Sequence, residues 1–418
     1  MTITSQSITD ADDTPQITLD DVKRARDQIG ENVIRTPLVK ATRLSLRLGI
    51  DLWLKLENLQ HTGAFKARGA LNKMLSLSDD QRKAGVIACS AGNHAQGVAF
   101  HAQRLGVPAT IVMPKGTPFN KIQKTEDFGA KVVLHGDSLP EAMDKTCQLA
   151  AEKGLAFIHP YDDREVVAGQ GTIGLEMMEQ NPDLDTIVVP IGGGGLISGI
   201  ASAAKAIKPD IDIIGAQTSL YAAVHNRLNG DGDIIGGGTI AEGIAVKEPS
   251  ETNLRTIKKL VARIDVVNES EIEDAVFSLL SSEKLVAEGA AGAGLAAIVQ
   301  NIAKFKGRKT ALVVCGGNID SRMLSTLILR GLVRDGRITR LRFEIDDTPG
   351  QLADISKIIG EEGANVVEVI HQRLMQAVPL KQAELDIVIE ARDRKHVEHI
   401  VSTLEAKGFK VRTMSQVS

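Results

Sequence analysis

The strongest constraint on the fold is an alternation of short apolar runs with amphipathic stretches from about residue 18 to about residue 330. The apolar runs are DLWLKL, GVIACS, ATIVMP, KVVLHG, TIVVPIG, DIIGAQ and TALVVCGG, and segments such as HAQGVAFHAQRLG and EAMDKTCQLAAEKG lie between them. Such runs are typical of strands buried on both faces, and the segments between them have a helical period. The sequence therefore predicts an α/β fold whose parallel-type sheets are covered by helices.

The first 17 residues have no basic region followed by an apolar core, so we expect a mobile tail rather than a secretory signal. The next segment, TLDDVKRARDQI, predicts a helix, because Thr18 and Asp21 have the spacing of a capping box. No run of about 18 apolar residues is present, so we expect no membrane partner.

The pattern changes at the arginine-rich stretch RGLVRDGRITR, and we interpret residues 331–337 as a solvated linker. Beyond it the sequence predicts, in order, the strand RLRFEID, the turn DTPG, the helix QLADISKIIGEEG, the strands NVVEVIHQRL and ELDIVIEA, the helix RKHVEHIVSTLEAKG and the strand KVRTM. This is the order of a ferredoxin-like βαββαβ unit. We therefore expect one domain at 18–330 and a separate domain at 338–418.

Composition excludes several classes of function. A net charge of -4 over 418 residues and 3% aromatic residues give no support to nucleic-acid binding. The cysteines, Cys89, Cys147 and Cys315, have neither disulfide-framework nor zinc-site spacing, which favours the cytoplasm. His94 and His101 have no acidic or cysteine partner at ligand spacing, so we expect no metal site.

Lys66 stands in an unusual context, because the stretch HTGAFKARGALNKML places it among small residues at the start of a predicted helix. One interpretation is a solvated helix face that Lys66 shares with Arg68 and Lys73. The other is a sheltered amine that loses its proton and attacks a carbonyl. The stretch alone does not decide between them.

A glycine cluster, GGGGLISG at residues 192–199, follows the predicted strand TIVVPI and precedes a helical pattern. Glycines at such a junction present backbone N–H groups and the positive end of a helix, which suits a phosphate. The dinucleotide pattern GxGxxG fails because Ile197 or Ser198 falls at the last glycine, and GxxxxGK fails because Ile200 follows Gly199. A small phosphorylated cofactor fits better than a dinucleotide or nucleotide.

Two more loops follow predicted strands, CSAGNHAQG at residues 89–97 and VVCGGN at residues 313–318. Ligands of open α/β sheets gather outside the carboxyl ends of strands, so these loops can converge. Each signal is weak alone, since an asparagine such as Asn93 is commonly a helix cap and a cysteine such as Cys315 a small buried residue.

Taken together, GAFKARGA, SAGNHAQG, GGGGLISG, TIAEGIAVK, VAEGAAG and VVCGGN resemble, in this order and spacing, the pyridoxal-phosphate-dependent threonine and serine dehydratases of the tryptophan-synthase-β fold. The resemblance covers roughly residues 18–330. It implies a two-subdomain fold-type-II enzyme, pyridoxal 5'-phosphate as cofactor, and threonine ammonia-lyase activity. The implied reaction converts L-threonine to 2-oxobutanoate and ammonia, and L-serine to pyruvate and ammonia.

The resemblance also implies roles for individual residues. Lys66 would be the Schiff-base lysine and the catalytic base, which answers the question that its context raises. The substrate carboxylate would meet Ser90, Ala91 and Gly92. The remaining cofactor-binding residues would be Phe65, Asn93, Gly192, Gly193, Gly194, Gly195, Leu196, Gly243 and Cys315.

The chain departs from two patterns that related enzymes share. Serine racemases carry a second serine where this chain has Ala91, and relatives with a divalent-cation site use acidic residues where this chain has Gln217 and Ala223. Serine or 3-hydroxyaspartate dehydratases and serine racemases of the same fold remain the alternatives. A nicotinamide-dependent oxidoreductase conflicts with the failed GxGxxG, and a non-catalytic amino-acid sensor would need no reactive lysine.

The C-terminal unit resembles an ACT domain, because DDTPGQL matches that family's first loop between strand and helix. The resemblance implies an amino-acid effector bound near Asp347, Pro349 and Gly350, and feedback control of isoleucine biosynthesis. ACT domains pair edge to edge, so we expect a homo-oligomer, a dimer or a tetramer. The alternative is a purely structural dimerisation module.

Overall fold

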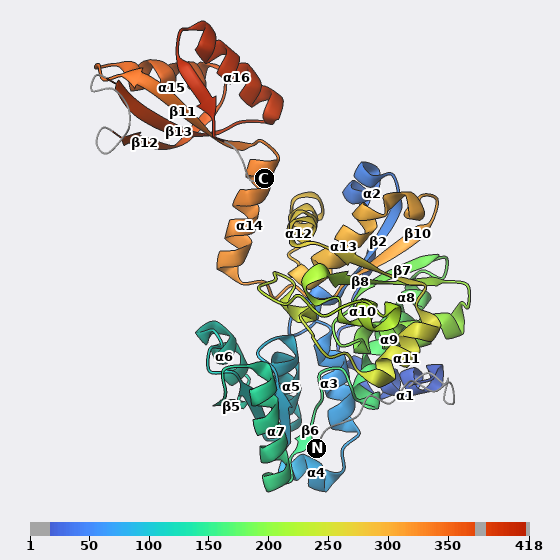
Figure 1. Cartoon of the computed structure of the whole chain (residues 1–418). Coiled ribbons are helices and arrows are strands. Elements are labelled where there is room, and N and C mark those ends of the chain that lie inside the picture. The colour runs from blue at the N-terminus through green and yellow to red at the C-terminus, as the bar shows by residue number, and fades with distance from the viewer. Residues whose placement is uncertain (1–16, 373–381, 415–418) are drawn as a thin grey trace. The chain divides into compact units, whose positions relative to one another are not determined.

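The computed structural model describes residues 17–372 and 382–414 (Figure 1). Its contacts divide the chain into two compact units, residues 1–319 and residues 320–418. The division falls earlier than the boundary expected at residue 330. The expected tail lies outside the described residues except for Ile17, which is buried against α1 (Leu19–Ile29) and α8 (Arg164–Gln180).

The larger sheet of the first unit has six strands in the order β1-β2-β10-β7-β8-β9. All neighbouring strands are parallel except β1 and β2, which are antiparallel. The strands are β1 (Leu38–Lys40), β2 (Asp51–Leu56), β7 (Thr186–Pro190), β8 (Asp212–Thr218), β9 (Arg263–Val267) and β10 (Lys309–Val314).

The second sheet of this unit is wholly parallel and has the order β5-β4-β3-β6. Its strands are β3 (Val86–Cys89), β4 (Ala109–Met113), β5 (Lys131–Leu134) and β6 (Ala156–Phe157). Two parallel-type sheets in one unit agree with the predicted two-subdomain α/β catalytic domain, and every strand predicted from an apolar run is present.

Helices follow most strands and cover the sheets (Figure 1). Besides α1 and α8 they are α2 (Thr42–Leu48), α3 (Lys66–Leu75), α4 (Asp79–Ala84), α5 (Asn93–Leu105), α6 (Phe119–Glu126), α7 (Leu139–Lys153), α9 (Gly195–Ile207), α10 (Ala223–Asn229), α11 (Glu251–Leu260), α12 (Glu269–Glu283) and α13 (Gly289–Gln300). The predicted capping box of α1 is present, since the Thr18 hydroxyl accepts from the Asp21 N–H and Asp21 accepts from the Thr18 N–H.

Glycines allow α3, α8 and α9 to pack closely behind the start of α3. A Cβ at Gly169 of α8 would lie 2.7 Å from the Cα of Gly69 in α3, and a Cβ at Gly199 of α9 would lie 2.7 Å from the main-chain nitrogen of Gly171. Backbones in such contact leave no room for side chains. The small-residue run after Lys66 is therefore a helix-packing surface.

Arg68 is fully buried, which corrects the interpretation of this helix as a solvated basic face. Its guanidinium donates to Glu57 (2.9 Å) and to Glu176 (2.6 Å), and Lys55 also pairs with Glu176. A buried guanidinium requires such partners, because its desolvation is costly. Lys73, in contrast, forms a partly exposed ion pair with Asp163.

The second unit begins with α14 (Ser321–Arg334) and continues as a four-stranded antiparallel sheet of order β12-β13-β11-β14. Its elements are β11 (Ile338–Asp346), α15 (Gln351–Glu361), β12 (Asn365–Gln372), β13 (Gln382–Glu390), α16 (Arg394–Ala406) and β14 (Lys410–Thr413). The βαββαβ order is the predicted one. The predicted linker 331–337 covers the end of α14 and the turn before β11, and the last two residues of NVVEVIHQRL lie outside the described residues.

The core of the second unit lies between its sheet and α15 and α16, which cover one face of the sheet (Figure 1). Burial alternates along β11, where Thr339, Leu341, Phe343 and Ile345 are buried. This period of two places one face of the strand in the core and the other face outside it. Across residues 17–372 and 382–414, no helix is both long enough and apolar enough to span a membrane.

Candidate active site

Lys66 opens α3, directly after the loop that pairs with the carboxyl end of β10. Lys66 is half-buried, and its amine donates a 2.6 Å hydrogen bond to the Pro160 carbonyl and lies 5.2 Å from the centre of the Phe65 ring. The Phe65 N–H donates to the Cys315 carbonyl (3.0 Å), and Ala64 forms a bridge with Gly316. The lysine is thus held by main-chain contacts on both sides.

Burial lowers the pKa of Lys66 to about 8, against the attraction of Cys315 and Glu288. The start of a helix adds a positive partial charge, which also disfavours the charged amine. Burial in turn raises the pKa of Glu288 and of the Cys315 thiol, so the negative charges that would hold the proton on Lys66 are weakened. An amine with this pKa is a nucleophile and a base near neutral pH.

Glu288 was given no role in the sequence analysis, yet its carboxyl connects two of the predicted cofactor-binding residues. The Asn93 amide nitrogen donates to both carboxyl oxygens (3.1 and 2.9 Å), and the Cys315 thiol donates to one of them over 3.6 Å. The Asn93 oxygen accepts from Asn318 (2.9 Å), which also donates to the Thr62 carbonyl (2.7 Å). An acid inside the apolar motif VAEGAAG is the signal that could have identified Glu288.

The tetraglycine loop, Gly192 to Gly195, connects β7 to the start of α9. We call it the glycine cradle, because side chains at these positions would fill the space in front of the helix start. A Cβ at Gly193 would lie 2.3 Å from the Tyr161 ring, and one at Gly195 would lie 2.8 Å from the Tyr161 carbonyl oxygen. Gly194 caps the helix with φ 93°, a left-handed conformation that favours glycine, and Leu196 is buried in the first turn. The first N–H groups of such a helix have no partner within the helix and are suited to a phosphate.

Asn253 fixes this loop from behind and was not found by sequence reasoning. Its amide nitrogen donates to the carbonyls of Gly193 (3.1 Å) and Tyr161 (2.9 Å), and the Ser250 N–H also donates to Gly193. The C=O and N–H of a trans peptide point in opposite directions, so anchoring the Gly193 carbonyl directs the Gly194 N–H the other way. A single asparagine in an amphipathic helix such as α11 carries no distinctive sequence signal.

The predicted carboxylate-binding residues form the turn between β3 and α5. Ser90, Ala91 and Gly92 are partly buried, the Ser90 hydroxyl accepts from the Gly92 N–H (3.1 Å), and Asn93 is the first residue of α5. Asn93 is therefore not the cap of its helix, and its side chain is available to Glu288. The turn also presents the start of a helix, where a carboxylate is stabilised.

Gly243, in the short helix η4 (Glu242–Ile244), connects the cradle to Glu288. A Cβ at Gly243 would lie 3.4 Å from a Glu288 carboxyl oxygen, and a Cβ at Gly192 would lie 3.4 Å from the Gly243 carbonyl oxygen. The structure thus brings Lys66, Phe65, Asn93, Gly243, Cys315 and the tetraglycine loop together in one region of the first unit. Asp347, Pro349 and Gly350 lie in the second unit, between β11 and α15.

Gln217 is fully buried at the end of β8, where related enzymes carry an acid. Its amide nitrogen donates to the carbonyls of Ile191 (3.3 Å) and Tyr221 (3.2 Å), and its oxygen accepts from the His225 N–H (2.9 Å). Ala223 is buried nearby at the start of α10. No group of three or more potential metal ligands occurs in the part of the chain that the structure describes.

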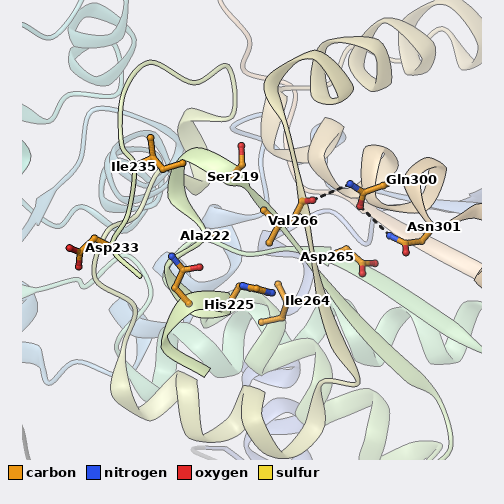
Figure 2. Close-up of a pocket in the computed structure, with 11 residues that line it drawn as sticks. Ser219, Ala222, His225, Asp233, Ile235, Ile264, Asp265, Val266, Gln300 and Asn301 are labelled. Carbon is orange, nitrogen blue, oxygen red and sulfur yellow. Dashed lines mark hydrogen bonds between the residues drawn. The ribbon is translucent and has the colours of Figure 1, made fainter. Parts of the chain in front are cut away.

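A hollow of about 380 Å³ near this turn is a different place from the Lys66 region (Figure 2). Its lining residues are Ser219, Ala222, His225, Asn226, Asp233, Ile235, Ile264, Asp265, Val266, Gln300 and Asn301. Within the hollow, the Gln300 amide nitrogen donates a hydrogen bond to the Val266 carbonyl, and the Gln300 oxygen accepts one from the Asn301 amide. None of the predicted catalytic or cofactor-binding residues lines this hollow.

The residues of the Lys66 region fit pyridoxal phosphate. A cofactor of this kind needs an amine that can be neutral, a phosphate cradle without side chains, and polar partners for the ring. The amine is that of Lys66, whose pKa is lowered. The cradle is formed by Gly192 to Gly195, and the polar partners are Asn93 and Cys315.

Comparison with known proteins supports this assignment. Residues 29–316 match the family model described as "Pyridoxal-phosphate dependent enzyme". The chain is 46% identical over 398 residues to an L-threonine ammonia-lyase of Thermotoga maritima, covering 95% of this chain and 99% of that protein. It is 41% identical over 320 residues to a catabolic L-threonine dehydratase of Escherichia coli, covering 74% of this chain and 96% of that protein.

Solved structures show the same relationship. The processed form of threonine deaminase isoform 2 from Solanum lycopersicum superposes with a TM-score of 0.69 at 35% identity, covering 74% of this chain and 91% of that chain. The maize serine racemase superposes with a TM-score of 0.70 at 33% identity, covering 76% of this chain and 99% of that chain. The half-buried lysine, the glycine cradle and these similarities agree, and the chain therefore belongs to the family of pyridoxal-phosphate dependent enzymes.

Proposed function

We propose that this enzyme is a threonine ammonia-lyase, a lyase that converts L-threonine to 2-oxobutanoate and ammonia and L-serine to pyruvate and ammonia. The observation that carries the proposal is the Lys66 amine, whose pKa is lowered to about 8 beside a glycine cradle for phosphate. The similarity to the Thermotoga maritima L-threonine ammonia-lyase over 95% of the chain supports the choice of reaction.

Pyridoxal phosphate, when bound, supplies the electron withdrawal that lets a proton leave the α-carbon of the amino acid. The backbone at the start of α9 would hold its phosphate, and Asn93 and Cys315 would hold the ring hydroxyl and the ring nitrogen. Ser90, Ala91 and Gly92 would bind the substrate carboxylate at the start of α5.

Lys66 is the group that would move the proton. Its amine is neutral in a substantial fraction near pH 8, so it can accept the α-proton as a general base. The Pro160 carbonyl and the Phe65 ring restrict where the amine lies. The β-hydroxyl then leaves as water. A water molecule is consumed when the remaining imine hydrolyses to the 2-oxo acid and ammonia, so the overall reaction has no net change in water.

The proposal is tested by measuring 2-oxobutanoate and ammonia formed from L-threonine by the purified, cofactor-loaded protein. D-Threonine is the control substrate, since its α-proton would face away from Lys66. Equal amounts of both products from L-threonine are expected, with little from D-threonine. A protein that shows the visible absorption of the cofactor but releases no 2-oxo acid from L-threonine or L-serine would contradict the proposal.

A serine racemase is the second candidate, favoured by the similarity to the maize enzyme. Racemisation needs a second acid–base group on the face of the α-carbon opposite Lys66. Ala91 supplies only a methyl group in the turn where serine racemases carry a serine, so we propose elimination rather than racemisation as the main reaction.

We also propose a regulatory role for the second unit. Its ferredoxin-like strand order and the motif DDTPGQL support an ACT-like domain at about residues 338–418 that binds an amino-acid effector near Asp347, Pro349 and Gly350. Feedback in isoleucine biosynthesis is the role that we infer, with a catabolic role as the alternative. Pairing of such units would give a homo-oligomer, a dimer or a tetramer, and the three free cysteines suit the cytoplasm.

A further inference from the structure

Glu288 is placed where three predicted cofactor-binding residues meet, Asn93, Cys315 and Gly243. It precedes α13, its N–H donates to the Gly316 carbonyl (3.0 Å), and its side chain is 9% exposed. A Cβ at Gly316 would lie 2.6 Å from its carboxyl oxygen, so the carboxyl packs directly on the backbone after Cys315. A buried carboxyl needs hydrogen-bond donors, and its partners are Asn93 and Cys315.

The hydrogen atoms of Asn93 can be counted. Its amide nitrogen carries two hydrogens, and its oxygen is occupied by Asn318. Glu288 accepts from that nitrogen through both oxygens, at 3.1 and 2.9 Å, which a single shared hydrogen can satisfy. The second hydrogen remains for the cofactor ring. Asn318 and Glu288 therefore fix the direction in which Asn93 can donate.

The Cys315 thiol has only one hydrogen, whereas the Asn93 amide has two. A hydrogen bond from the thiol to Glu288 therefore leaves no thiol hydrogen for the cofactor ring. When Glu288 is ionised, the thiol donates to it and can offer only its sulfur to the ring nitrogen. When Glu288 is protonated, the thiol hydrogen is free to turn to the ring nitrogen. The two states of Glu288 present two different environments to the same edge of the ring.

We propose that Glu288 is a positioning residue that orients Asn93 and Cys315 together and thereby sets the protonation of the bound cofactor ring. Cys315, proposed above to meet the ring nitrogen, then acts as one half of a thiol and carboxyl pair. The proposal rests on the cofactor site of the family and not on the choice of threonine as substrate.

The test is a pH titration of the visible absorption of the cofactor-loaded enzyme, since that absorption changes when the ring gains or loses a proton. Burial raises the pKa of Glu288 above its ordinary 4.5, so the wild-type spectrum should change with a midpoint above pH 4.5. The charged or titratable groups that face Glu288 are Lys66, Cys315 and Glu242. In Glu288→Gln this transition should be absent, because the amide does not ionise.

The cofactor affinity of Glu288→Ala and a matched control variant separate this role from a merely structural one. The dissociation constant of the cofactor should rise about 2- to 10-fold for each hydrogen bond lost in Glu288→Ala. Glu242→Gln is the matched control, because it removes a neighbouring carboxylate that is 59% exposed and paired with Lys121. This control should keep a transition, with its midpoint moved to lower pH because Glu242 no longer raises the pKa of Glu288, and it should keep the wild-type cofactor affinity.

The outcomes are distinct. A transition that persists unchanged in Glu288→Gln, with unchanged cofactor affinity, would overturn the proposal. If that variant fails to bind cofactor, Glu288→Asp replaces it, and a midpoint identical to wild type would then overturn the proposal, because the shorter side chain cannot keep both contacts. No substrate is used, so the result is independent of whether L-threonine is turned over.

Discussion

The Lys66 amine donates a 2.6 Å hydrogen bond to the carbonyl oxygen of Pro160, a residue 94 positions further along the chain. The next residue, Tyr161, lies against Gly193 and Gly195, and its carbonyl accepts from Asn253. One short segment therefore holds the lysine and borders the phosphate cradle. The distance between amine and cradle is set by this segment before any cofactor binds, which is the preorganisation that such a site requires.

Replacing Lys66 by alanine should abolish ammonia release from L-threonine, because it removes the covalent anchor and the base together. Activity should fall by at least about 10³-fold, while the circular dichroism spectrum stays native. Lys73→Ala is the control, since Lys73 lies on the same helix in a partly exposed ion pair with Asp163. Wild-type turnover by Lys66→Ala would show that another residue does this work.

The lowered pKa of Lys66 predicts how cofactor capture depends on pH. A lysine with a pKa of about 8 is charged and unreactive below that pH and neutral above it. The rate at which the apoenzyme captures pyridoxal phosphate should rise about 50-fold from pH 6 to pH 8, and only about twofold more above it. Stopped-flow absorption measures this rate, with N-acetyl-lysine as the control. A rise that continues to pH 10, as for the free amine, would refute the assigned pKa.

The strands and the separate C-terminal unit could be predicted because their patterns are local. The apolar runs predicted the parallel strands, and β11 contains the segment RLRFEID that was predicted as a strand. The short edge strands β1 and β6 and the partly exposed β9 give weaker patterns and were not predicted. Asn93 follows β3 and Cys315 follows β10, which are strands of two different sheets, so the meeting of both side chains at Glu288 does not follow from the topology of one sheet.

Residues that act through long-range contacts could not be predicted. The sequence around Arg68 is typical of a surface residue. Its partners Glu57 and Glu176 lie 11 and 108 positions away in the sequence, so the sequence does not indicate that they contact it. The roles of Glu288 and Asn253 likewise depend on contacts with residues that are distant in the sequence. Composition and periodicity report burial of apolar faces, and they contain no information on which buried polar groups pair.

Gln217→Glu should make the fold depend on a divalent cation. The amide of Gln217 donates to two carbonyls, and a carboxylate would place oxygen against both of them. Unmet acceptors of this kind cost about 1 to 3 kcal/mol each, whereas a hard cation bound by the same oxygens would recover part of that loss. Thermal unfolding with magnesium or with EDTA measures the effect.

The exposed Gln300 provides the control for this change, because Gln300→Glu alters charge at the surface near the same turn. That variant should be indifferent to magnesium. The wild-type enzyme should also be indifferent, in activity and in stability. Equal stability of Gln217→Glu with magnesium and with EDTA would mean that the new carboxylate binds no cation at this place.

Ala91 predicts that elimination exceeds racemisation. Its methyl group cannot return a proton to the α-carbon, so D-serine should form at less than about a tenth of the rate of pyruvate formation. Ala91→Ser should raise D-serine formation, and Ala91→Gly, which adds no hydroxyl, should not. Chiral chromatography of the reaction with L-serine measures both products. Fast D-serine formation by the wild-type enzyme would contradict the role assigned to this position.

The loop before α15 predicts allosteric control by isoleucine or valine. Gly350 caps α15 with φ 102°, and among the residues that the structure describes, its two chain neighbours aside, no atom lies within 4 Å of the position that its Cβ would occupy. An open helix start with Asp347 and Pro349 beside it can offer backbone N–H groups to the α-carboxylate of an amino acid. A coupling of about 1 to 3 kcal/mol would change threonine affinity about 5- to 150-fold.

Two variants locate this effector site. A chain that ends at Arg337 lacks β11 to β14, and it should keep threonine deamination but lose any response to isoleucine or valine. A response that survives this truncation would place the effector site elsewhere in the protein.

Gly350→Ala makes the sharper test, because Gly408→Ala is a matched control in the same unit. Gly408 has φ 92° and equally open surroundings, so an added methyl group strains the backbone similarly at both positions. Only at Gly350 would it also disturb the loop expected to bind the carboxylate. Gly350→Ala should raise the isoleucine concentration for half-maximal response at least tenfold with basal activity unchanged. Equal responses of the two variants would assign any loss to strain and remove Gly350 from the site.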